Sequence, residues 1–263
     1  MKPRSAPDLV RSIYLLWGRH PAPGRSGLTV EKIVDAGIAL ADEEGLTATS
    51  MRKVAQRLGT SAMSLYNYVP SKEDLSALMV DRVNGEVYES DAPFGASDWQ
   101  TSLRSIARYN WELYLQHPWL LDIRDTRPAL GPGISRKYEL ELRVLEGIGL
   151  DDIEMDSTLT LLLSIVQAAA RVQADARTTQ EESGMTDLEW WSVISPVLEH
   201  VMSDGEYPVS ARVGYAVGTA YQGLQDTDHA LSFGVETLID GVRARLRAKN
   251  SAGVPAPEVD TGQ

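Results

Sequence analysis

The sequence predicts an all-α protein in which a small N-terminal three-helix unit precedes a larger helical domain. Three observations predict this fold: apolar residues recur at three- and four-residue intervals, no run of β-branched residues has period two, and Gly and Pro gather between the periodic stretches. The 263 residues suffice for a small domain and a larger one. With 43% hydrophobic and 24% charged residues, the composition argues against disorder throughout.

Charge is distributed unevenly along the chain. Residues 1–72 hold 10 basic and 6 acidic side chains, whereas residues 73–263 hold 15 basic and 31 acidic ones. The net charge of -12 argues against a surface covered with nucleic-acid sites. A basic N-terminal quarter on an acidic remainder is instead the pattern expected when one small module meets a polyanion.

The chain contains no cysteine, which excludes disulfides, thiolate nucleophiles, zinc fingers and iron–sulfur clusters. The longest apolar stretch, residues 159–170, is interrupted by polar side chains and is shorter than the roughly 20 residues of a membrane span. Residues 13–17 lack the length and cleavage site of a secretion signal. We therefore expect a cytoplasmic protein without membrane association.

Residues 1–28 predict a short helical arm and a flexible tether, because apolar residues with helical spacing are surrounded by Pro and Gly. The arm carries Arg4, Arg11, Arg19 and Arg25, which can contact phosphates or a minor groove. Its apolar segment is better suited to packing on a neighbouring surface.

Two amphipathic helices are predicted over residues 30–44 and 50–58. Thr29 caps the first, and Gly45 ends it. Gly59 follows the second as a residue suited to positive φ.

A very short helix and a longer one follow. Ser61 caps the short segment, residues 62–68, and Ser71 caps a helix over residues 72–88. The inner stripe of this longer helix consists of Leu75, Leu78, Met79, Arg82 and Val83.

A helix, a glycine turn and a very short second helix inside a basic segment form the outline of a helix-turn-helix, although an αα-hairpin of any helical bundle has the same outline. The outer face favours DNA binding, because its side chains can bind phosphates, form hydrogen bonds or stack. These side chains are Arg52, Lys53 and Arg57 for phosphates, and Ser61, Ser64, Tyr66, Asn67 and Tyr68 for hydrogen bonds and stacking.

Residues 29–78 closely resemble the DNA-binding domain of the tetracycline-repressor (TetR) family. The resemblance lies in the pattern IVDAGIALADEEGLTATSMRKVAQRLGTSAMSLYNYVPSKEDLSALM, with its small-residue first helix, its EEG and AQRLG turns, LYNYV and the closing SKEDL. It implies that residues 62–68 form the recognition helix and that Tyr66 and Lys72 contact phosphates. Base contacts would come from Ala62, Met63, Ser64 and Asn67, with Arg52 reaching from the preceding helix, while Leu65, Val54, Ala55 and Leu58 would be core.

The larger domain is predicted to be helical over residues 98–116, 134–148, 152–179, 187–202, 209–220 and 229–249. With the resemblance, which implies a helical domain for ligand binding and dimerisation after the DNA-binding domain, the expected organisation is an arm (1–28), a helix-turn-helix domain (29–74), a ligand-binding and dimerisation domain (75–249) and a disordered tail (250–263).

The stretch LSFGVETLIDGVRARL resembles the closing helix of the tetracycline-repressor-like branch, in which two late helices of each subunit form a four-helix dimer interface. The resemblance implies a homodimer through residues 152–179 and 229–246 and a palindromic operator. The apolar faces of these helices support it: Leu159, Leu162, Leu163, Val166, Ala169 and Ala170 on one, and Leu231, Val235, Leu238, Ile239, Val242 and Leu246 on the other. The alternative is that both faces form the core of the monomer.

Aromatic residues between Trp99 and Tyr138, with nearby polar side chains, predict as a group a pocket for a planar or polycyclic small molecule, although ordinary core packing is the better explanation of any one ring. Gln167 and Arg171 lie one turn apart on an apolar helix, so they bind either the ligand or a neighbouring helix. The candidate ligand contacts are Trp111, Tyr114, Arg124, Tyr138, Gln167 and Arg171.

The four histidines lack metal-ligand spacing, and no hydrolase elbow, P-loop or dinucleotide fingerprint is present, so we expect no metal, no cofactor and no enzyme activity. The resulting hypothesis is a dimeric repressor that a small-molecule effector releases from operator DNA. The alternative is a DNA-binding activator, or a regulator controlled by a protein partner.

Overall fold

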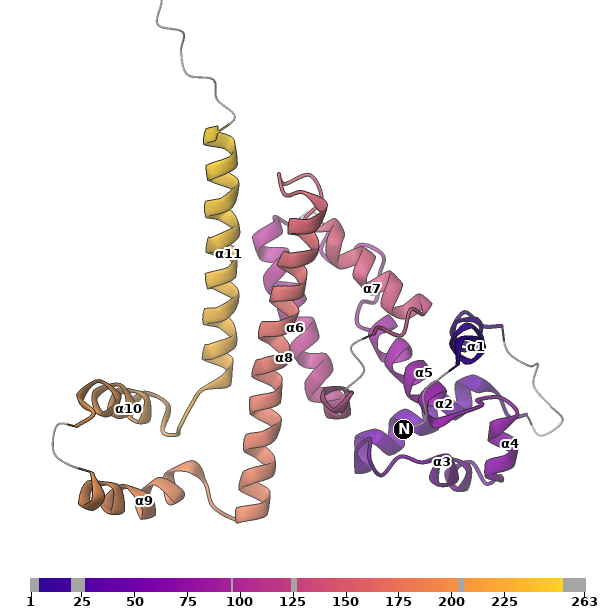
Figure 1. Ribbon diagram of the computed structural model, residues 1–263, viewed down its shortest axis with the longest axis horizontal. Coiled ribbons are helices and arrows are strands. Elements are labelled where there is room, and N and C mark those ends of the chain that lie inside the picture. The colour runs from indigo at the N-terminus through magenta and orange to yellow at the C-terminus, as the bar shows by residue number, and fades with distance from the viewer. Residues whose placement is uncertain (1–4, 20–26, 96, 124–126, 203–205, 253–263) are drawn as a thin grey trace, which may run out of the picture.

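The structure is a computed structural model that describes residues 5–19, 27–95, 97–123, 127–202 and 206–252. These residues form helices joined by turns and contain no β-strand, which confirms the all-α prediction. Three parts are visible in Figure 1: a compact cluster of short helices, a central layer of longer ones, and a two-helix arm on the opposite side.

The N-terminal unit comprises α2 to α5, with the helix α1 packed against it. The bounds are α1 Ala6–Leu16, α2 Val30–Glu44, α3 Met51–Arg57, α4 Ala62–Tyr66 and α5 Lys72–Gly85. The expected short segment 62–68 therefore ends two residues earlier, and the expected helix 72–88 ends at Gly85. Arg82, expected on the inner stripe of α5, is instead half-exposed and ion-paired with Asp35.

Each helix of the N-terminal unit starts where a side-chain oxygen caps it. The hydroxyls of Thr29, Ser50, Ser61 and Ser71 accept hydrogen bonds from backbone N–H groups three residues further on. At the other end, α2 stops at Gly45, which has a φ of 82°, a conformation that favours glycine. The predicted caps of this unit are confirmed.

Helix α1 packs one side against α5, and its other side is exposed. Leu15 and Leu16 are buried, and the Ser12 hydroxyl bonds to Asp74 of α5. The Trp17 indole N–H donates to the carbonyl of Leu130 at 2.9 Å. Leu15 and Leu16 thus pack on a neighbouring surface, whereas most of the apolar segment expected to do so is exposed: Leu9, Val10, Ile13, Tyr14 and Trp17. Arg4, Arg25 and most of the expected tether lie outside the described residues.

The C-terminal unit comprises the remaining elements. They are α6 Trp99–Gln116, the 3-10 helix η1 Pro118–Asp122, α7 Pro132–Arg143, α8 Asp152–Ser183, α9 Asp187–Val201, α10 Pro208–Tyr221 and α11 Thr227–Ala252. Helix η1 lies between the predicted helices 98–116 and 134–148, where no helix was expected. Helix α7 ends at Arg143, five residues before the predicted end of its segment at Ile148.

Two hydrophobic cores form, and they do not coincide with the two units. Core 1 lies between α2, α3, α4 and α5, yet it also contains Leu113, Trp119 and Leu120 from α6 and η1. Core 2 lies between α6, α8 and α11 and contains Leu103, Leu162 and Ile239. Helix η1 therefore contributes side chains to both cores, since its Leu121 belongs to core 2.

The apolar faces expected at the dimer interface pack on each other within the subunit. Leu159, Leu162 and Val166 of α8 are buried with Val235 and Ile239 of α11 in core 2. The alternative that these faces form the core of the monomer therefore holds for these side chains. By length and mean hydropathy (1.2) α8 would also suit a membrane span, but its buried stripe is that of a core helix.

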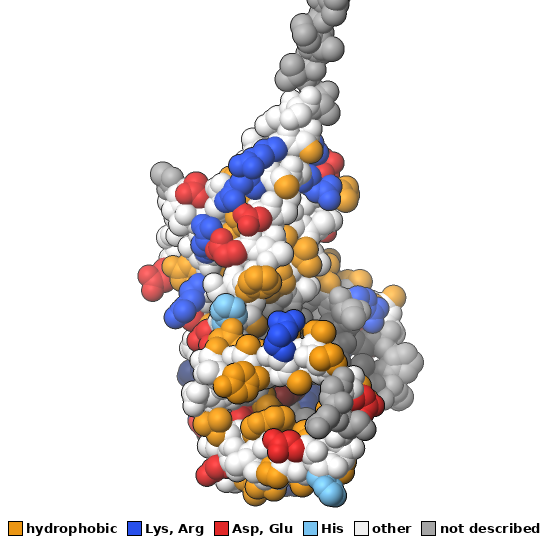
Figure 2. All heavy atoms as spheres, turned by 90° about the vertical axis from the view of Figure 1, so that its left-hand side faces the viewer, with side chains coloured by type: hydrophobic (Ala, Val, Ile, Leu, Met, Phe, Trp, Pro, Cys, Tyr) orange, Lys and Arg blue, Asp and Glu red, His pale blue; other side chains and the backbone are white. Residues whose placement is uncertain are grey.

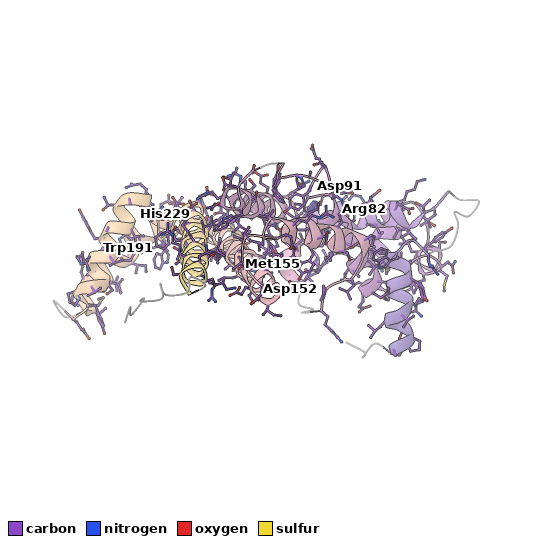
Figure 3. All side chains as sticks on the ribbon, turned by 90° about the horizontal axis from the view of Figure 1, so that it is seen from above. Arg82, Asp91, Asp152, Met155, Trp191 and His229 are labelled. Carbon is purple, nitrogen blue, oxygen red and sulfur yellow. The ribbon has the colours of Figure 1, made fainter. Side chains whose placement is uncertain are left out.

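Helices α9 and α10 form an arm that projects from the ends of α8 and α11 (Figure 1). Neither helix contains a buried residue. In Figure 2 hydrophobic side chains gather over the lower half of the visible face, where the arm lies. Figure 3 places Trp191 and His229 at the opposite end of the molecule from Arg82 and Asp91.

Helices α5 and α7 cross closely because glycines line the contact. A Cβ on Gly85 would lie 2.9 Å from Gly133 Cα, and a Cβ on Gly133 would overlap the carbonyl oxygen of Asp81. The Asp81 carboxylate accepts hydrogen bonds from the backbone N–H groups of Gly133 (3.2 Å) and Ile134 (2.9 Å). It thereby caps α7, whose own N-cap residue, Gly131, has no side chain to do so. Burial raises the pKa of Asp81, and the two N–H donors oppose this shift.

The substitution Gly133→Ala is expected to lower the free energy of unfolding by about 1–3 kcal/mol, because the new methyl group would force α5 and α7 apart. The matched control is Gly214→Ala in α10, where nothing lies within 4 Å of the added Cβ. It is expected to raise stability by about 0.5–1 kcal/mol through helix propensity. Guanidinium unfolding followed by circular dichroism measures both, and equal effects would contradict the close crossing.

Candidate DNA interface and domain junction

The exposed face of α4 carries side chains that can reach DNA. Met63 is 74% exposed and Tyr66 is 45% exposed, and Asn67 at the end of the helix is exposed as well. The hydroxyls of Ser61 and Ser64 lie 2.9 Å apart, next to the start of the helix. Beneath this face, Leu65 is fully buried and, with Val54 and Ala55, anchors the motif in core 1.

Two residues expected to contact DNA are less available than the sequence suggests. Ala62 and Tyr68 are half-buried and pack against core 1. The interface offered by α4 is therefore centred on the exposed side chains of Met63, Tyr66 and Asn67, with the half-buried Ser64 between them.

Acidic residues at the end of α2 neutralise part of the basic face. Arg57 binds Glu43 with two hydrogen bonds of 2.6 Å, and Lys53 lies 2.5 Å from Glu44. The Arg57 guanidinium lowers the pKa of Glu43. By contrast, Arg52 is exposed and makes no ion pair with any described residue. A phosphate must displace a carboxylate from Lys53 or Arg57, but not from Arg52.

Lys72 begins α5 beside the recognition helix and is exposed. Its one hydrogen bond to a described residue is to the Leu46 carbonyl at 3.4 Å, so its charge remains available to a phosphate.

The residues expected to bind a small molecule do not gather around one hollow. Trp111 is 4% exposed and lies in core 2, while Tyr114 is half-buried between the two cores. Tyr138 is exposed, and its hydroxyl donates to Asp156 at 2.8 Å.

The remaining predicted contacts are also dispersed. Gln167 is exposed on α8, and Arg124 lies outside the described residues. The Arg171 guanidinium donates to the Leu121 carbonyl and lies 3.3 Å from Asp122, so it holds η1. Of the two interpretations of the Gln167–Arg171 pair, the interhelical contact is the one observed for Arg171.

A hollow of about 660 Å³ lies between the end of α5 and α6, at the junction of the two units. This volume is within the range of small-molecule sites. None of the described ligand residues predicted from the sequence lines it. Its walls include Val83, Val87, Tyr88, Tyr109, Gln116 and His117.

A buried carboxylate fixes one wall of this hollow. Glu141 of α7 is 1% exposed, and its Oε1 atom accepts from the Tyr88 hydroxyl (2.7 Å), Asn110 Nδ2 (2.9 Å) and Lys137 Nζ (2.9 Å). Burial, with the Glu141 charge, raises the pKa of Tyr88. Three donors on one oxygen compensate the desolvation of the carboxylate and hold Tyr88 against α7.

A second polar contact joins the units on the side of α2. Asp42 Oδ1 lies 2.7 Å from both His117 Nδ1 and Trp119 Nε1. Within the residues that the structure describes, no group of three or more acidic or histidine side chains is placed to hold a metal ion.

Comparison with known proteins assigns the family. A model of bacterial regulatory proteins of the tetR family matches residues 33–78, and a model of the tetracyclin repressor-like C-terminal domain matches residues 92–246. The chain belongs to the TetR family. Members of this family are transcriptional regulators and not enzymes. They bind operator DNA through a helix-turn-helix, which in this chain lies within residues 33–78.

Two similar proteins align with most of the length of this TetR-family chain. The HTH-type transcriptional repressor DrrR1 of Streptomyces coeruleorubidus is 37% identical over 251 residues, which cover 94% of this chain and 90% of DrrR1. An HTH-type transcriptional regulator of Saccharopolyspora erythraea is 29% identical over 232 residues, covering 87% and 91%.

Among solved structures, apo ActR from Streptomyces coelicolor superposes with a TM-score of 0.67 at 26% identity, covering 87% of this chain and 99% of ActR. ActR in complex with actinorhodin gives a TM-score of 0.65 at 27% identity, covering 83% and 98%.

Sequence reasoning missed the residues that join the two units of this TetR-family protein. The sequence pattern singles out none of Asp42, Asp81, His117 and Glu141. Apart from Lys137, one helical turn from Glu141, their partners lie more than 30 residues away in sequence, so local periodicity contains no signal for these contacts.

The substitution Lys72→Gln is expected to weaken binding to all duplexes by a similar factor and to reduce the slope of log affinity against log salt by about 1, because it removes one phosphate contact. Lys32→Gln is the matched control, since Lys32 carries the same charge on α2 and donates to the Gly27 carbonyl at 2.8 Å. Fluorescence anisotropy at several salt concentrations measures both. An unchanged slope for Lys72→Gln would contradict the contact.

Proposed function

We propose that the chain is a cytoplasmic, dimeric transcriptional repressor that binds a palindromic operator and is released by a small molecule. The observation that carries this proposal is the exposed face of α4. The helix that follows it, α5, packs against α7 and so connects α4 to the C-terminal unit. Two relatives support it: DrrR1 is a repressor, and ActR has been solved with actinorhodin bound. A dimer doubles the base contacts of a single short recognition helix.

Selection of bound fragments from sheared genomic DNA tests this proposal. We expect enrichment of an inverted repeat whose affinity falls steeply with salt. Failure of folded, dimeric protein to enrich any sequence would refute it.

We propose the hollow between α5 and α6 as the effector site. It lies where a ligand touches both units, so binding there can favour one arrangement of the units over another, which release from DNA requires. The Tyr109 ring is 40% exposed and meets the Tyr88 ring edge-on at 5.4 Å, which leaves part of it available for an aromatic ligand.

With actinorhodin as the first polycyclic probe, Tyr109→Ala is expected to weaken binding roughly two- to tenfold through loss of one aromatic contact. Tyr138→Ala is the matched control, because Tyr138 is similarly exposed but does not line the hollow. Quenching of tryptophan fluorescence measures both. If Tyr138→Ala weakened binding and Tyr109→Ala did not, the effector site would lie elsewhere.

We propose that the dimer forms through the exposed sides of α8 and α11, since their other sides are buried in core 2. Leu161 is 52% exposed on α8, and Phe233 is 67% exposed on α11. The arm of α9 and α10 extends the same apolar surface and supports this assignment.

Phe233→Glu is expected to shift the protein to monomers, because a carboxylate in an apolar interface is desolvated without a partner. Leu130→Glu, at a 56% exposed position before α7, is the control and is expected to remain dimeric. Sedimentation equilibrium distinguishes the two states. A Phe233→Glu dimer as tight as the unsubstituted one would place the interface elsewhere.

A further inference from the structure

The contact between α2 and η1 has the geometry of a rigid joint. One carboxylate oxygen of Asp42 binds two ring nitrogens, His117 Nδ1 and Trp119 Nε1, each at 2.7 Å. Trp119 is 2% exposed and His117 is 9% exposed. Because both rings are buried and held at their polar atoms, neither can rotate without losing a hydrogen bond.

The other side of η1 is fixed to α8. Arg171 donates to the Leu121 carbonyl and pairs with Asp122, and the Leu121 side chain is buried in core 2. Helix η1 is therefore a short spacer between α2, which carries the helix-turn-helix, and α8, which we assign to the dimer interface.

A second attachment lies at α5 and α7, where Asp81 caps α7. One attachment alone permits rotation about itself, whereas attachments at different places restrict that rotation. The N-terminal unit is attached at α2 through Asp42, at α5 through Asp81 and beside α1 through the Trp17 hydrogen bond to Leu130, so these contacts together determine its angle relative to α8.

We propose that Asp42, with His117 and Trp119, sets the angle at which each subunit presents α4 and thereby determines which half-site spacing the dimer accepts. This inference rests on the proposed function, because it requires a dimer on a palindrome. The half-sites of such operators lie about one helical turn, or a multiple of it, apart. A dimer whose two α4 recognition helices are held at fixed angles binds operators of one half-site spacing. It binds operators with a shorter or longer spacing more weakly.

The same joint is within reach of the proposed effector site. His117 lines the hollow between α5 and α6. A molecule bound there contacts the ring that Asp42 holds, so it can act on the angle of the N-terminal unit directly.

The experiment uses the selected operator and a series of duplexes in which the half-site spacing changes by one or two base pairs. Asp42→Ala removes both hydrogen bonds, whereas Asp42→Asn keeps an oxygen that can accept them. His117→Phe removes one bond, whereas His117→Asn places an amide N–H near the position of Nδ1. Glu43→Ala is the control, since Glu43 is the neighbouring acid on α2 and pairs with Arg57 inside the N-terminal unit.

We expect Asp42→Ala and His117→Phe to lower affinity for the native spacing about tenfold, or about 1.4 kcal/mol, and to bind the altered spacings nearly as well as the native one. Affinity for a duplex with a single half-site is expected to stay unchanged, which a defect in folding would not allow. Asp42→Asn, His117→Asn and Glu43→Ala are expected to keep the original preference for one spacing.

An unchanged spacing preference in Asp42→Ala, or in His117→Phe if Asp42→Ala does not fold, would overturn the inference. If the proposed function itself were wrong, the result would differ: the unsubstituted protein would enrich no palindrome from genomic DNA, so no series of half-site spacings could be prepared.

Discussion

The hydrophobic core beneath the helix-turn-helix is completed by side chains from the C-terminal unit. Leu113, Trp119 and Leu120 pack with residues of α2, α3 and α5 in core 1. A three-helix unit of this size buries little apolar surface by itself, so these residues supply part of its stability. The DNA-reading helix consequently cannot move independently of α6 and η1 without exposing apolar surface to water.

Two carboxylates direct this shared packing. Asp42 accepts hydrogen bonds from η1, and Asp81 accepts them from the start of α7. Leaving such a donor unpaired and buried costs about 1–3 kcal/mol. The junction therefore permits few arrangements, and a ligand that favours one of them changes the presentation of α4 through its different affinity for the alternatives. The buried Glu141 cluster has the same effect on the Tyr88 wall of the hollow.

The parts of the structure that local sequence determines were predictable, and those that depend on distant contacts were not. Thr29, Ser61 and Ser71 mark helix starts because a cap acts within three residues, whereas Ser50, expected inside its helix, is a cap as well. The polar outer face around α4 followed from the local residue pattern, and the burial of Leu65 from the family resemblance. The pairing of Arg57 with Glu43, the partners of Asp42 and the exposure of Gln167 depend on how separate helices pack. The apolar stripes of α8 were ambiguous for the same reason, since subunit cores and dimer interfaces have the same composition.

The most direct test of the role of the Asp42 contact is the distance between the two α4 recognition helices in the dimer without DNA. Because the chain lacks cysteine, Met63→Cys, at a position 74% exposed, gives a single spin-label site per subunit for pulsed electron–electron double resonance. We expect one narrow distance distribution, which broadens when Asp42→Ala is added, because each N-terminal unit loses one of its attachments to the C-terminal unit. A distribution of the same width in both proteins would contradict the claim that this joint holds the helices in place.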